Sequence, residues 1–221
     1  MNVVDRIVES DLLPEPLLRR AIRANLRLRL RRERRAGETQ RRAFVAELRR
    51  SPIALSPAAP NDQHYEEPPA FFELVLGPRL KYSSCLWEPG ISSLAAAEDA
   101  MLALTCERAR LEDGMRILDL GCGWGSFALY AAERYPAARI TAVSNSRDQG
   151  AWIEARAPAN VEVVTADVNG LELDGRFDRV VSVEMFEHMR NYELLLRKLS
   201  RQLTPDGLLF VHLFCHAEHA Y

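Results

Sequence analysis

Residues 117–126 have the sequence Ile-Leu-Asp-Leu-Gly-Cys-Gly-Trp-Gly-Ser, in which an apolar run passes into a glycine-rich turn. Glycines in such a turn let the backbone approach a ligand closely and leave the N-terminus of the next helix facing it. The spacing is G-x-G-x-G after Asp119, whereas a dinucleotide-binding turn has the spacing G-x-G-x-x-G. A dinucleotide site also has a carboxylate at the end of the second strand, where this chain has Ser144, Asn145 and Ser146. The pattern therefore favours a nucleoside ligand without a pyrophosphate.

Short apolar runs alternate with amphipathic stretches on both sides of this turn. Such alternation is typical of an α/β fold, a parallel sheet covered by helices on both faces. We predict strands at Arg116–Leu120, Arg139–Ser144, Val161–Ala166, Phe177–Val183 and Leu208–Phe214. We predict helices at Phe71–Leu76, Leu94–Arg110, Ser126–Arg134, Arg147–Ala157 and Tyr192–Leu203.

The chain divides by composition into three parts. Residues 1–60 are predicted to be a basic helical extension with a proline-rich linker, and its helical pattern breaks near Ala36-Gly37. Prolines through residues 51–69 predict an extended linker. Residues 61–110 are predicted to form a helical cap over the ligand site, and residues 111–221 a Rossmann-like domain.

The overall composition is that of a globular protein. Of 221 residues, 48% are hydrophobic and 27% charged, which excludes a disordered chain or a fibrous repeat. No run approaches the roughly 18 consecutive apolar residues of a membrane-spanning helix. The N-terminus carries Asp5, Glu9 and Asp11 instead of a secretory signal, and the four cysteines form no CxxC pair. We therefore expect a cytoplasmic protein with reduced thiols.

The N-terminal extension is strongly basic. Residues 1–50 contain 14 arginines and 7 acidic residues, in a chain whose net charge is −2. Apolar residues recur there at helical spacing, at Leu13, Leu17, Leu18, Ile22, Leu26 and Leu30. We expect a surface helix docked by this stripe, and peripheral contact with an anionic membrane stays open as the alternative. Arginine outnumbers lysine 27 to 2 over the whole chain, so the arginines are no evidence for a nucleic-acid partner, and we expect none.

The motifs taken together resemble a known family. Asp119-x-Gly121-x-Gly123-x-Gly125 is similar to the first motif of class I S-adenosylmethionine-dependent methyltransferases. The chain resembles in particular the cyclopropane-fatty-acyl-phospholipid synthase superfamily and, within it, the coclaurine N-methyltransferase-like group. The segments that carry this resemblance are Asn61–Glu66, Leu80–Cys85, Ser144–Ser146 with Gln149, Glu184–Met189 and Phe210–His212.

The resemblance implies S-adenosylmethionine as the cofactor. In the family the glycine turn holds this cofactor, an aromatic–hydroxyl pair closes over it, and polar residues after the second strand replace the usual ribose-binding acid. Carried over to this chain, the cofactor-binding residues are Tyr82, Ser83, Asp119, Gly121, Gly123, Gly125, Asn145, Ser146, Gln149 and Asp167.

Residues 183–191 are the best catalytic candidates, because they follow the fourth predicted strand at the edge where open α/β sheets hold ligands. If this segment is helical, Glu184 lies on one face with Glu187 and His188. An amine attacks only when neutral, so a nearby base helps, and a histidine oriented by a carboxylate suits that role. The resemblance implies catalytic roles for these three residues. The alternative is that Glu187 and His188 merely cap the following helix.

Three further residues are candidates for a substrate or anion pocket. His212 lies on the last predicted strand, where lipid-modifying relatives hold bicarbonate, and it is otherwise a plausible core histidine. His64 lies in the linker, and the resemblance implies that it helps to roof the pocket. Ser84 stands where the lipid-modifying branch has a bicarbonate-binding cysteine, which disfavours cyclopropanation. The remaining histidines have no partners at metal-ligand spacing, so we predict no metal site.

The family also has two further strands, in an antiparallel hairpin, beyond the five that can be recognised before Tyr221. We therefore expect the chain to be truncated at its C-terminus. Three hypotheses follow. The first is methyl transfer to an amine of a small molecule. The second is methylation or cyclopropanation of unsaturated phospholipid acyl chains. The third is a non-catalytic fragment that binds S-adenosylmethionine. The oligomeric state stays open.

Overall fold

The computed structural model describes residues 13–55 and 68–218. Residues 48–214 form one compact unit, and the helical arm before them belongs to a second unit. The arm consists of two helices, Glu15–Arg35 (α2) and Glu38–Arg50 (α3), and the last three residues of α3 already belong to the larger unit. The boundary between the two helices confirms the predicted break at Ala36-Gly37.

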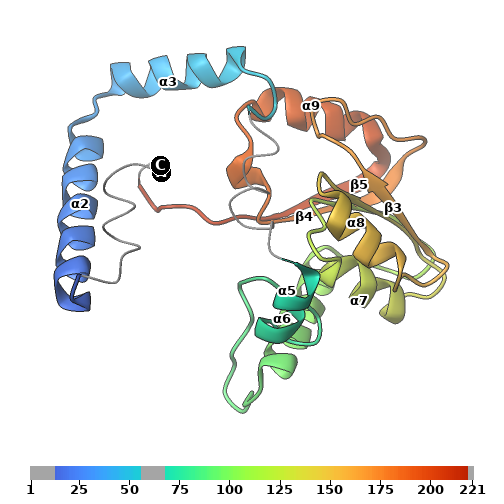
Figure 1. Ribbon diagram of the computed structural model, residues 1–221. Coiled ribbons are helices and arrows are strands. Elements are labelled where there is room, and N and C mark those ends of the chain that lie inside the picture. The colour runs from blue at the N-terminus through green and yellow to red at the C-terminus, as the bar shows by residue number, and fades with distance from the viewer. Residues whose placement is uncertain (1–12, 56–67, 219–221) are drawn as a thin grey trace. The chain divides into compact units, whose positions relative to one another are not determined.

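The larger unit contains a five-stranded parallel sheet in the order β3-β2-β1-β4-β5 (Figure 1). Its strands are Arg116–Leu120 (β1), Arg139–Ser144 (β2), Val161–Thr165 (β3), Phe177–Val183 (β4) and Leu203–His212 (β5). Its helices are Pro69–Val75 (α5), Leu94–Arg108 (α6), Ser126–Arg134 (α7), Arg147–Glu154 (α8) and Tyr192–Gln202 (α9), with a 3-10 helix at Phe186–His188 (η1). The order reverses beside β1, and open α/β sheets bind ligands at such a point. The predicted α/β fold is confirmed.

The two faces of the sheet are covered by different helices, α7 and α8 on one face and α9 on the other (Figure 1). Alternate residues of one strand serve both faces, because successive side chains point in opposite directions. Ile117 belongs to the apolar cluster that contains Ala128 of α7 and Ile153 of α8, whereas Leu118 belongs to the separate cluster that contains Leu195 of α9. Burial on both faces explains why the strands are continuous apolar runs.

The apolar stripe of α2 has no buried partner among the described residues of the arm itself. No residue of α2 is buried, and Leu17, Ile22 and Leu26 are 50–59% exposed. The expectation that α2 docks by this stripe therefore stays a prediction. Local features contribute small amounts to this helix: the exposed ion pair between Glu15 and Arg19 and the arginines of its last turn. None of the described helices is long and apolar enough to cross a membrane.

The segment predicted as a linker is only partly described. Residues 56–67 lie outside the described part of the chain, and α5 begins at Pro69. In the part that the structure describes, Ile53 and Ala54 are 7% and 5% exposed, so the backbone there packs against the domain and does not run free.

Candidate functional site

The glycine turn links β1 to α7 in a conformation that only glycine adopts easily. Gly121 has φ +83°, and a Cβ atom there would lie 2.7 Å from Cγ of Met185. Gly123 has φ +53°, but a Cβ atom there would meet nothing within 4 Å. The first glycine is therefore required by packing between the ends of β1 and β4, whereas the second faces open space that a ligand can approach.

Asp119, at the end of β1, has a buried carboxylate with unused bonding capacity. Its residue is 2% exposed, and its Oδ2 atom has no hydrogen-bond partner among the described residues. Burial raises the pKa of Asp119 to about 7, opposed only by a hydrogen bond with the backbone of Ala128. A buried acceptor without a donor calls for a ligand that supplies a cation or an N–H group.

The end of β2 supplies a second polar group. The hydroxyl of Ser144 donates to Oε1 of Gln149 at 2.7 Å, and the Ser146 hydroxyl caps α8 by accepting the Gln149 N–H at 3.4 Å. The Nε2 atom of Gln149 is buried without an acceptor among the residues described. Asn145, between the two serines, is exposed. The amide of Gln149 is thus held in one orientation with donors to spare for a hydroxyl-bearing ligand.

Glu184 stands at the end of β4 and joins the segment before α6 to the sheet. It has φ +52°, and its N–H donates to the carbonyl of His212 at 2.7 Å. Its two carboxylate oxygens accept hydrogen bonds from the hydroxyls of Ser83 and Ser84. Ser84 also has positive φ, at +57°. Two residues in this uncommon conformation thus face each other, which is a feature seen at functional sites.

The surroundings of Glu184 favour its ionised form. Burial raises the pKa of this carboxyl, but the hydrogen bonds from Ser83 and Ser84 and the charges of Lys81 and His212 outweigh burial and lower it. Lys81 is 8% exposed, and burial lowers the pKa of its ammonium group. The site therefore holds a carboxylate ready to attract a developing positive charge.

A second buried carboxylate supports the segment that carries these serines. Glu98, on α6, is fully buried and accepts the backbone N–H groups of Arg79 at 3.1 Å and Lys81 at 3.0 Å. The Lys81 ammonium donates to the carbonyl of Ser83 at 2.7 Å. A Cβ atom on Gly77 would lie 2.2 Å from a Glu98 oxygen, so only glycine leaves room for the Glu98 carboxylate in this position. Glu98 thereby fixes the backbone that presents Ser83.

The predicted catalytic helix is not formed as expected. Only Phe186–His188 are helical, in a single 3-10 turn, and Glu184 precedes it in a left-handed conformation. Glu184 and His188 therefore do not share a helical face. One oxygen of Glu187 accepts the N–H of Phe214, while its Oε2 is buried without a partner among the described residues. His188 is exposed.

The helix-capping alternative for these residues is also wrong, because Asn191 caps α9. The Asn191 side chain accepts the N–H of Leu194 at 3.1 Å. An asparagine directly before a helical pattern is a recognised start signal, so the sequence contained this information. No such signal marks Lys81 and Glu98 as residues of the site, because their roles depend on contacts between segments that are distant in the sequence.

The remaining predicted site residues lie at the same edge of the sheet or outside the described chain. Tyr82, next to Ser83, is 47% exposed and approaches the Phe72 ring at 6.1 Å between centroids. Asp167 follows β3, and its Oδ1 accepts the Asn169 N–H at 2.8 Å. His64 lies outside the described residues.

The residues present fit S-adenosylmethionine. The cofactor combines a nucleoside, which carries hydroxyl groups, with cationic ammonium and sulfonium groups. The buried oxygen of Asp119 suits a cationic group, and the oriented amide of Gln149 suits a hydroxyl of the nucleoside. The open side of Gly123 leaves room for the cofactor's close approach. The roles of the individual site residues remain predictions.

Three comparisons identify relatives of the chain. It is 40% identical over 222 residues to (S)-coclaurine N-methyltransferase of Thalictrum flavum subsp. glaucum, covering 97% of this chain and 62% of that protein. It superposes on the crystal structure of coclaurine N-methyltransferase bound to N-methylheliamine and SAH with a TM-score of 0.89 and 38% identity, covering 100% of this chain and 67% of that one. It is 35% identical over 153 residues to cyclopropane-fatty-acyl-phospholipid synthase of Escherichia coli strain K12, covering 68% of this chain and 39% of that protein.

The chain thus spans less than two thirds of the length of the first of these relatives. Residues 56–220, well over half of it, match the mycolic acid cyclopropane synthetase family. This match, together with the superposed fold, confirms the resemblance seen in the motifs, and the chain belongs to that family.

Proposed function

We propose that the site transfers a methyl group from S-adenosylmethionine to an amine nitrogen of a small molecule. The observation that carries this proposal is the Glu184 carboxylate, held by Ser83 and Ser84 at the carboxyl edge of the sheet. Relatives named for N-methylation of coclaurine and for cyclopropane formation support methyl transfer in general. The similarity of the whole described fold to the coclaurine enzyme favours an amine acceptor.

In this reaction the cofactor supplies an electrophilic methyl group on sulfur. The amine lone pair forms the new nitrogen–carbon bond as the carbon–sulfur bond breaks and its electrons pass to sulfur. The nitrogen becomes positively charged, and it then loses a proton when it carries one. Asp119, Gln149 and the Gly123 turn hold the cofactor in this scheme.

The acidic residues act on the amine. Glu184, kept ionised by its serine donors and by Lys81, stabilises the positive charge that develops on nitrogen. Glu187 has one oxygen bound to the Phe214 N–H and the other without a partner among the described residues, so that oxygen accepts the departing proton or orients His188 to do so.

A phospholipid acceptor is the second candidate, and α2 is the observation that favours it. This helix carries nine arginines together with the exposed side chains of Leu17, Ile22 and Leu26. Such a helix suits the surface of an anionic bilayer, where an acyl-chain acceptor is found. Ser84 favours the amine acceptor instead, because it stands where the lipid-modifying branch has a cysteine. Its hydroxyl donates a hydrogen bond to the Glu184 carboxylate.

One experiment separates these candidates. The protein is incubated with S-adenosylmethionine bearing a fully deuterated methyl group, a panel of amines and vesicles of unsaturated anionic phospholipid, and products are measured by mass spectrometry. An amine product that retains all three deuterons supports the proposal. A lipid product with two deuterons indicates ring closure and overturns it. Cofactor binding without any product overturns both candidates and leaves a binding module.

A further inference from the structure

Residues 51–55 cross two loops of the candidate site. This segment, here called the strap, follows α3 and contains the buried side chains of Ile53 and Ala54. Ile53 lies in the apolar cluster that contains Phe186 of the 3-10 turn and Leu195 of α9. Leu55, two residues further on, is 57% exposed. The strap therefore contacts the domain through its centre.

The strap is attached first to the turn that carries Glu187 and His188. The Ile53 carbonyl accepts the N–H of Arg190, two residues after that turn, at 2.7 Å. The Asn191 side chain, 2% exposed, donates to the carbonyls of Arg49 at 2.9 Å and Ser51 at 2.8 Å. One buried amide thus both caps α9 and holds the start of the strap.

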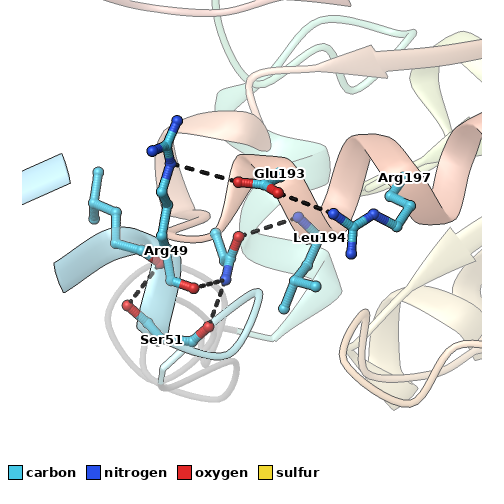
Figure 2. Close-up of polar contacts among 7 residues, drawn as sticks. Arg49, Ser51, Glu193, Leu194 and Arg197 are labelled. Carbon is cyan, nitrogen blue, oxygen red and sulfur yellow. Dashed lines mark hydrogen bonds and ion pairs between the residues drawn. The ribbon is translucent and has the colours of Figure 1, made fainter. Parts of the chain in front are cut away.

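Exposed ion pairs surround the hydrogen bonds that Asn191 makes to the start of the strap. Figure 2 shows Arg49 and Ser51 facing the first turn of α9, where Glu193 lies 3.4 Å from Arg49 and 2.9 Å from Arg197. All three charged side chains are more than half exposed, so they contribute little. The buried hydrogen bonds of Asn191 hold the attachment.

The strap is attached second to the loop after β3. Ala54 and Asn169 form a paired contact, in which the Ala54 N–H donates to Oδ1 at 3.1 Å and Asn169 Nδ2 donates to the Ala54 carbonyl at 3.0 Å. Asn169 in turn donates through its backbone to the Asp167 carboxylate at 2.8 Å. This is the carboxylate predicted to lie near the cofactor. Ile53 is therefore attached beside the turn that carries Glu187, and the adjacent Ala54 is attached to the loop that carries Asp167.

Neither loop is held by regular structure of its own. The turn consists of three 3-10 residues after a left-handed Glu184, and residues 166–176 form no helix or strand. Such segments open at low free-energy cost unless external contacts fix them. We propose that the strap is a positioning element, in which Ile53 and Ala54 couple the Asp167 loop to the turn that carries Glu187. This inference rests on the proposed function for its catalytic consequence and on the contacts alone for its structural part.

Hydrogen exchange tests the structural part without requiring methyl transfer. Ile53→Ala truncates the strap's side chain in the apolar cluster that contains Phe186, and amides of residues 167–170 and 186–191 should then exchange about tenfold faster. Leu55→Ala is the matched control in the strap, and Ile140→Ala is a control in the apolar cluster on the other sheet face. Faster exchange confined to the two loops in Ile53→Ala supports the proposal. Unchanged exchange, or the same rise in Ile140→Ala, overturns it.

Coupling is tested with S-adenosylhomocysteine as the probe. In the unmodified protein, adding this ligand should slow exchange at residues 186–191, and in Ile53→Ala that protection should be lost while the ligand still binds. Protection that persists in Ile53→Ala overturns the coupling. Where methyl transfer is measurable, Ile53→Ala should lower kcat about tenfold with a smaller change in KM, and Ile53→Val should restore it. If the unmodified protein binds S-adenosylhomocysteine but transfers no methyl group, the proposed function fails and the exchange results still decide the role of the strap.

Discussion

The hydroxyl of Ser83 donates a hydrogen bond to the carboxylate of Glu184, although the two residues are 101 positions apart in the chain. Ser83 belongs to the segment before α6, and Glu184 follows β4, so this contact joins that segment to the edge of the sheet. The adjacent Ser84 binds the other carboxylate oxygen. A carboxylate with both oxygens engaged is fixed in direction, and a fixed charge stabilises a transition state better than a mobile one.

We expect Glu184→Gln to lower the methyl-transfer rate by about 10²-fold or more, because the amide is uncharged and donates where the serines require an acceptor. Binding of S-adenosylhomocysteine, measured by calorimetry, should change less than threefold. Ser83→Ala should lower the rate by about tenfold, and Ser83→Ala in the Glu184→Gln background should add little, because both changes disrupt one interaction. Ser200→Ala, on the exposed side of α9, is the matched serine control. Additive losses in the double variant would contradict the pairing.

Lys81→Met is expected to shift the acid limb of the pH–rate profile. Burial raises the pKa of Glu184, and the hydrogen bonds from its two serines together with the charge of Lys81 lower it below the usual value. Removal of that charge lets the pKa rise, so activity should be lost at a higher pH as the solution is acidified. Lys81→Arg keeps the charge and should preserve the acid limb. An acid limb that does not move in Lys81→Met would show that Lys81 acts only through its bond to the Ser83 carbonyl.

The sheet was predictable because its signal is local. Four strands and four helices begin at the residues expected from apolar runs and turn signals, among them β1 at Arg116 and α7 at Ser126. The fifth strand begins at Leu203 and not at Leu208 as predicted. Its ladder shifts register opposite Phe177 and Arg179, so Pro205 and Gly207 lie within an irregular strand and do not end it.

The candidate site was less predictable because its geometry is not periodic. The motif pointed to Glu184 and Ser83, but no pattern in the sequence shows that Glu184 adopts a left-handed conformation and leaves the helix expected there. The buried Glu98 acts on backbone N–H groups 17 and 19 residues away. Ile53 looks like a linker residue until its neighbours in space are known. Contacts between distant segments decide these roles.

Asp119→Asn should change how stability depends on pH in the absence of cofactor. Burial raises the pKa of this carboxyl from 3.8 to about 7, so the folded protein binds the proton more tightly than the unfolded chain. The free energy of unfolding therefore falls as pH rises from about 4 to about 7, by on the order of 4 kcal/mol. Asparagine does not titrate, so the variant should lose this dependence.

Denaturant unfolding at pH 5 and pH 8 measures the effect. The stability of Asp119→Asn relative to the unmodified protein should increase between those two values by about 3 kcal/mol. The same substitution should weaken S-adenosylhomocysteine binding about tenfold or more, because the buried oxygen no longer carries charge. Asp174→Asn, which removes an exposed carboxylate, is the control. If the free energy of unfolding depends on pH equally in both variants, Asp119 is not the group whose protonation stabilises the fold.

Gly121→Ala should be more damaging than Gly114→Ala, although both glycines have φ +83°. An alanine at either position pays the same backbone strain, about 1–2 kcal/mol of unfolding free energy. A Cβ atom at Gly114 would meet nothing within 4 Å, whereas one at Gly121 would lie 2.7 Å from Cγ of Met185. Relief of that contact requires Met185 to move, at a further cost of about 1–3 kcal/mol.

The difference between these two alanine variants reports on the site as well as on stability. Met185 lies between Glu184 and the 3-10 turn, so its displacement should also disturb the carboxylate and lower methyl transfer in Gly121→Ala beyond the loss in cofactor affinity. Met185→Ala in the Gly121→Ala background removes the clashing atoms and should recover part of the stability. If the two glycine variants are equally stable, the close approach of β1 to Met185 does not govern this turn.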